Sequence, residues 1–288
     1  MCRMRRLAPG ILVLCFLPIA TAAWIEFPSN AKRLSATDLE ISGDLAAMPA
    51  GTTRFLSREQ LLILPLVTYT VTDDPNFSGA TVIRGVLLEE LLHRLGSPKA
   101  DLVVAVCDDK YRAHYTREYL ALRHPVLVLE VNGKPPAGWP KDAHEHQFDM
   151  GPYMVSHAKF ISPGAGDEEA QIPWGVVGIE FQSAAQVFGA IAPRGPHAHA
   201  ADVQAGFHIA RASCFRCHML AAQSGQKSWV PWEALAGVAA AAPDWFAAYV
   251  RNPQSKNPQS QMPGSPQYDA KTMRALTAYF HTFAQPEK

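Results

Sequence analysis

The chain has 288 residues, of which 48% are hydrophobic and 18% are charged. This composition is typical of a globular protein, and it excludes a disordered chain and a membrane protein with several spans. The 26 basic and 26 acidic residues give no excess of positive charge, so we expect no nucleic-acid partner. At this length, two domains are a better expectation than one.

Residues 1–23 have the pattern of a secretory signal peptide. Arg3, Arg5 and Arg6 precede an apolar run at residues 7–20, and small residues follow up to Ala23. The run is shorter than the roughly 20 residues that a transmembrane helix needs, which disfavours the alternative of a retained anchor. Cleavage would remove three of the 26 basic residues and leave a net charge of −3. We therefore expect a periplasmic protein without a transmembrane span.

Residues 24–190 are predicted to form a mixed α/β domain. β-branched and apolar residues predict strands at residues 66–71, 102–106, 126–131 and 176–181. Between the first two, the apolar spacing of residues 86–95 predicts a helix that ends at Gly96.

The remainder of the chain is predicted to be helical. Residues 191–201 are rich in Pro, Gly and His and are expected to link two domains, the second at residues 202–288. Pro243 begins a predicted helix that ends near Arg251. A last helix is expected after Asp269, with Met273, Leu276 and Phe280 on its apolar face.

The strongest functional signal is the segment Cys214-Phe215-Arg216-Cys217-His218. The spacing C-x-x-C-H is the attachment signature of a c-type haem, and a chain of this composition would contain it by chance only about 0.003 times. Two thiols form thioether bonds to the haem vinyl groups, and the adjacent imidazole binds the iron. We therefore predict one covalent haem c held by Cys214, Cys217 and His218.

The cysteine count excludes a disulfide framework in the mature chain. Cys2 and Cys15 leave with the signal peptide, and Cys214 and Cys217 are assigned to haem. Cys107 is then the only thiol left, at the end of a predicted buried strand, where a core role is expected.

The sixth iron ligand is predicted to be Met262. Met219 adjoins the proximal His218, and Met273 lies on the apolar face of the last helix, whereas Met262 lies in a Pro-rich polar loop that is free to turn toward the iron. A thioether ligand suits an electron carrier. The alternative is an open or His-ligated site, for which His208 is the obvious candidate.

Residues 202–284 resemble a class I c-type cytochrome. The resemblance rests on Gly206 in the first helix, the haem motif, Pro231, the Met262-Pro263 loop and a closing aromatic helix. It implies that His218 and Met262 bind the iron and that the carbonyl of Pro231 accepts a hydrogen bond from the other nitrogen of His218.

Other histidines are weaker candidates. His208 is expected to be an ordinary, partly exposed helix residue. The pairs His144/His146 and His197/His199 have the spacing of some metal sites but lack a full set of ligands.

The first domain resembles the molybdopterin-binding fold of sulfite-oxidase-like proteins. The segments that carry the resemblance are residues 39–45, 56–61, 64–65, 85–92, 108–111 and 151–153. The chemistry of those enzymes needs a cysteine thiolate on molybdenum shortly before the segment that matches Gly85, and residues 67–81 contain no Cys. We therefore expect this domain to lack molybdenum.

Together these patterns predict an α+β protein, with a mixed α/β sulfite-oxidase-like domain followed by an all-α cytochrome c domain. The expected function is periplasmic transfer of single electrons between redox protein partners, without a catalytic acid, base or nucleophile. Two alternatives remain open: a molybdopterin-dependent oxidoreductase that passes electrons to its own haem, and a haem-based sensor with an open iron position.

Overall fold

The computed structural model describes residues 28–143, 148–158, 170–220 and 224–284. The predicted signal peptide and the pair His144/His146 lie outside the described residues. No helix in the part of the chain that the structure describes is long and apolar enough to span a membrane.

The N-terminal half is built on one mixed sheet of nine strands. The strands are β1 (Leu39–Gly43), β2 (Arg54–Leu56), β3 (Val67–Val71), β4 (Thr81–Leu87), β5 (Leu102–Cys107), β6 (Arg112–Thr116), β7 (Pro125–Val131), β8 (Tyr153–His157) and β9 (Trp174–Gln182). Their order is β2-β1-β9-β8-β7-β4-β3, and β5 pairs with β6 and β9. Of these pairings, only that of β1 with β9 is parallel.

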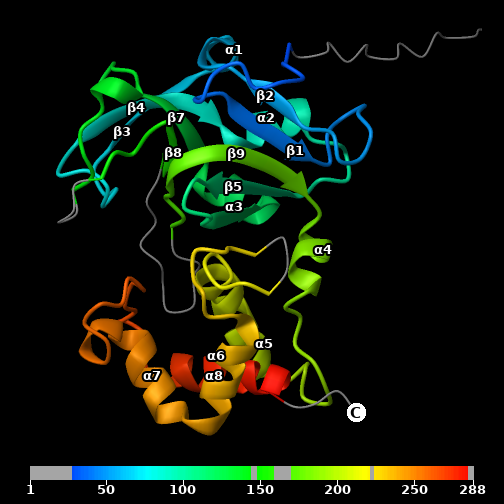
Figure 1. Cartoon of the computed structure of the whole chain (residues 1–288), viewed down its shortest axis with the longest axis vertical. Coiled ribbons are helices and arrows are strands. Elements are labelled where there is room, and N and C mark those ends of the chain that lie inside the picture. The colour runs from blue at the N-terminus through cyan, green and yellow to red at the C-terminus, as the bar shows by residue number, and fades with distance from the viewer. Residues whose placement is uncertain (1–27, 144–147, 159–169, 221–223, 285–288) are drawn as a thin grey trace, which may run out of the picture.

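Eight α-helices complete the described structure. They are α1 (Arg58–Leu62), α2 (Leu88–Leu95), α3 (Arg117–Arg123), α4 (Ala184–Gly189), α5 (Ala201–Ile209), α6 (Trp232–Ala241), α7 (Pro243–Arg251) and α8 (Ala270–Ala284). Short 3₁₀ turns lie at Pro136–Gly138 and Pro253–Ser255, and a π turn lies at Ala210–Cys214. Figure 1 shows α5 to α8 grouped below the sheet, with α4 descending between the two halves.

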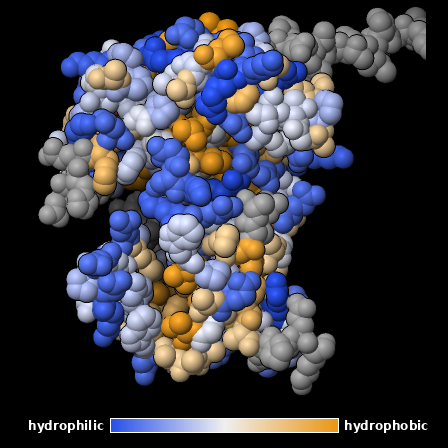
Figure 2. Space-filling view, viewed as in Figure 1, coloured by the Kyte–Doolittle hydropathy of each residue, from blue (hydrophilic) through white to orange (hydrophobic). Residues whose placement is uncertain are grey.

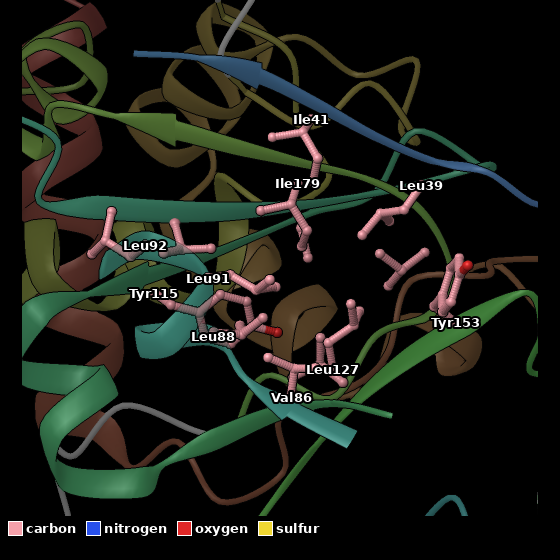
Figure 3. Packing of buried hydrophobic residues seen from close by; sticks show 14 of the residues in the cluster. Leu39, Ile41, Val86, Leu88, Leu91, Leu92, Tyr115, Leu127, Tyr153 and Ile179 are labelled. Carbon is pink, nitrogen blue, oxygen red and sulfur yellow. The ribbon is translucent and has the colours of Figure 1, made fainter. Parts of the chain in front are cut away.

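The main core of the sheet packs α2 against the strands. Leu88, Leu91 and Leu92 of α2 are buried and meet residues such as Tyr115 and Ile179, as Figure 3 shows. Cys107 belongs to this same cluster and is only 4% exposed, as expected for a core residue at the end of a buried strand.

The predicted helix at residues 86–95 begins too early. Val86 and Leu87 belong to β4, where they pair with Leu127 and Val126 of β7, and α2 starts at Leu88. A long-range strand pairing therefore takes two residues whose local sequence favours a helix.

The prediction for α7 is confirmed at both ends, since the helix runs from Pro243 to Arg251. The cap of α8 is also as expected, because the backbone N–H of Thr272 donates to the Asp269 carboxylate at 2.7 Å.

A second core joins the helices to the sheet. Leu102 and Val104 of β5 lie in one cluster with Phe188, Trp232 and Leu276. Ile191, at the start of the predicted linker, is fully buried in this cluster, and its carbonyl accepts a hydrogen bond from the Tyr279 hydroxyl at 2.7 Å. The helices therefore pack directly on the outer face of β5.

Candidate haem site

One turn of chain carries both thiols and the imidazole of the predicted haem motif. Helix α5 runs into the π turn, where the N–H of Phe215 donates to the Ala210 carbonyl at 3.0 Å. The Cys214 carbonyl then accepts from the N–H groups of Cys217, at 3.2 Å, and His218, at 3.0 Å. These bonds bring Cys214, Cys217 and His218 together on a single turn, as haem attachment requires.

The imidazole of His218 is oriented by the backbone. Its Nδ1 lies 2.8 Å from the carbonyl oxygen of Val230, and the residue is 8% exposed. A carbonyl oxygen only accepts, so Nδ1 carries the proton. Burial lowers the pKa of His218, although the bond to Val230 opposes this, so the ring is neutral at pH 7. Nε2 therefore carries the lone pair that an iron ligand needs.

The acceptor differs from the expected one by one residue. The resemblance assigned this role to the carbonyl of Pro231, but that carbonyl accepts from the N–H groups of Ala234 and Leu235. Pro231 is the N-cap of α6, so its carbonyl belongs to the first turn of that helix and Val230 is left to orient His218.

Both thiols are free and partly buried. Burial raises the pKa of Cys214 to about 12 and also raises the pKa of Cys217, while the positive charge of Arg216 opposes both shifts. Both side chains are therefore neutral thiols at pH 7.

The chain after the motif folds back tightly on the same turn. The N–H of Gly225 donates to the Phe215 carbonyl at 2.9 Å, and that of Ser228 donates to the Cys217 carbonyl at 3.0 Å. A Cβ atom at Gly225 would lie 1.7 Å from the Arg216 carbonyl oxygen. Only glycine allows this approach without a backbone shift.

The three methionines of the C-terminal half differ in their burial. Met262 is partly buried against the second core, and its carbonyl accepts a hydrogen bond from the Gln254 amide at 3.0 Å. Met273 is 3% exposed in the core, as predicted, and Met219 is 43% exposed. Met262 thus lies in a tethered loop against the cluster that also contacts Cys214.

The other histidines do not gather into a site. His208 is exposed on α5, and His197 and His199 are exposed before it. No cluster of three or more His, Cys, Asp or Glu suited to a metal ion occurs within the described ranges.

A pocket of about 480 Å³ lies beside α2 and α3 in the N-terminal half. Its lining includes Glu89, His93 and Arg117 and contains no thiol. Cys107 lies elsewhere, and burial raises the pKa of its thiol far above the usual range.

Hydrophobic side chains are exposed near the haem motif. Trp229 is 96% exposed, and Val230 and Met219 are also exposed. Figure 2 shows hydrophobic residues on the helical half of the face in view, between more hydrophilic edges.

The chain was compared with family models, curated proteins and solved structures. No family model and no curated protein matches the chain. Among solved structures, the sulfane dehydrogenase SoxCD from Paracoccus pantotrophus matches with 17% identity and a TM-score of 0.34 over 53% of this chain and 40% of that one. The chain thus spans less than half the length of that relative.

Proposed function

We propose that the protein is a monohaem c-type cytochrome that passes single electrons between redox proteins. The observation that carries this proposal is the turn that groups Cys214, Cys217 and a neutral His218 whose Nδ1 donates to the Val230 carbonyl. This donor set fits haem c, because it offers two thiols for thioether bonds and an imidazole Nε2 for the iron.

The residues around the motif favour an electron carrier. Haem, when bound, supplies a one-electron change between Fe(III) and Fe(II). Phe215, Trp232 and Phe280 are fully buried. Trp232 packs edge to face on Phe215 and tilted on Phe280, which excludes water from this side of the site. We assign Met262 as the second axial ligand, because its loop lies against the same cluster.

The Met262→Ala variant is expected to lose any methionine–iron charge-transfer band and to have a lower reduction potential, because a thioether stabilises Fe(II). Absorption spectra and a redox titration measure both changes. Met219→Ala is the matched control: this residue is exposed beside the proximal ligand, so the same substitution should leave the spectrum unchanged. An unchanged spectrum in Met262→Ala would favour the sensor alternative.

The α/β half is proposed to be an accessory domain of sulfite-oxidase-like origin that does not use molybdenum. The segment at residues 67–81 contains no Cys, and the Cys107 thiol is buried in the core. The role of this half would then be to position the haem-attachment segment, because β5 shares the second core with Phe215 of that segment.

Export to the periplasm is part of the same proposal. A chain matured through its own signal peptide is expected to begin at Trp24, which intact mass and N-terminal sequencing determine. Recovery of the uncleaved chain from the membrane fraction would indicate a retained anchor instead.

A further inference from the structure

The turn between β5 and β6 contacts the haem-attachment segment directly. The N–H of Arg112 donates to the Arg216 carbonyl, and the N–H of Gln226 donates to the Lys110 carbonyl, both at 3.0 Å. Lys227 also forms an ion pair with Asp109 at 2.5 Å. The first half of the chain therefore packs against one side of the segment that would carry the haem.

Arg216 extends this contact into the motif itself. It lies between the two thiols in the sequence and is only 9% exposed. Its Nη1 donates to the Tyr111 hydroxyl at 3.0 Å. Tyr111 remains a neutral acceptor, because burial raises its pKa to about 12. The hydroxyl therefore fixes a guanidinium, which is always charged, beside the haem attachment points.

A buried positive charge beside a haem acts on its redox equilibrium. Fe(III) haem carries one more positive charge than Fe(II) haem, so a nearby cation favours the reduced form. We propose that Arg216, held by Tyr111 of the first domain, is a positioning residue that raises the reduction potential of the haem. This inference rests on the proposed haem function and deepens it, because it gives the α/β half a part in redox tuning.

The test compares the midpoint potentials of haem-loaded Tyr111→Phe, Arg216→Gln and the double variant with that of the unaltered protein. Arg216→Gln is expected to lower the ratio of reduced to oxidised haem at a fixed potential about tenfold, a shift of about 59 mV for a one-electron couple, because the loss of a unit charge beside a partly buried redox centre has an effect of this order. Tyr111→Phe should shift the potential in the same direction but less, since it frees the guanidinium without removing its charge. The double variant should have the same midpoint potential as Arg216→Gln, because the hydroxyl acts only through the guanidinium.

Two controls separate this effect from a general disturbance. Arg216→Lys keeps the positive charge, so its midpoint potential should lie close to that of the unaltered protein. Tyr69→Phe removes a hydroxyl from the edge strand β3, away from the haem segment, and should leave the potential unchanged.

The outcomes distinguish this inference from the proposed function. If the unaltered protein carries no covalent haem, both fail. If the haem is present but Tyr111→Phe has an unchanged potential, or shifts it equally with and without Arg216, the inference alone fails. If Arg216→Gln yields no loaded protein, the comparison of Tyr111→Phe and Arg216→Lys with the unaltered protein still decides.

Discussion

The Gly206→Ala variant is expected to lose about 3 kcal/mol of unfolding free energy. Gly206 is buried on α5 where this helix crosses α8, and a Cβ atom there would lie 2.0 Å from the Ala275 carbonyl oxygen and 2.7 Å from Tyr279 Cβ. Because the first clash is with backbone, the two helices must separate. Denaturant unfolding of the haem-loaded protein, followed by far-UV circular dichroism, measures the loss.

Gly237→Ala provides the matched control for this substitution. Gly237 is exposed within α6, and a Cβ atom there would meet nothing within 4 Å. Alanine at this helical position should therefore stabilise the protein by about 0.5–1 kcal/mol. Equal stability of the two variants would show that α5 and α8 do not cross at Gly206.

Replacing both Cys214 and Cys217 by alanine is expected to abolish covalent haem. The two thiols lie on one turn with His218, and thioether bonds to the vinyl groups need both sulfur atoms. Haem staining of the denatured protein after electrophoresis detects the loss, since only covalently attached haem remains with the chain.

Cys107, the third free thiol among the described residues, offers the control for this experiment. Cys107→Ala makes the same chemical change at a buried residue of the first core and should keep the covalent haem. Haem that persists in the double variant, or that is lost only in Cys107→Ala, would contradict the assignment of the motif.

Local sequence was a good guide where local interactions decide the structure. The bounds of α7 follow from Pro243 and Pro253, and the start of α8 follows from the Asp269 cap. Strands β1, β2, β4, β6 and β8 were not predicted. In β6, Arg112 and His114 give the sequence a polar character, but His114 is buried against Phe215 of the haem segment, with ring centroids 5.1 Å apart. This burial depends on a part of the chain about a hundred residues away.

In the candidate site, too, residues that are close in the sequence were predicted and contacts between distant residues were not. Cys214, Cys217 and His218 are adjacent in sequence, so their spacing is sufficient to find them. The residue that accepts the hydrogen bond from His218 depends on how the later part of the chain packs against the motif. The acceptor is Val230, one residue before the expected Pro231. The bond from Arg216 to Tyr111 joins residues 105 positions apart, and no local pattern marks it.

The most direct test of the proposed function is a count of haem, iron and molybdenum per chain. The protein should be matured through its own signal peptide in a host with intact haem-attachment and molybdopterin pathways, and then measured by elemental analysis and by the absorbance of its denatured haem. We predict one covalently held haem iron and no molybdenum per chain. A chain without covalent haem would contradict this prediction. Near-stoichiometric molybdenum would instead indicate that the α/β half is an enzyme, with Cys107 as the first residue to test.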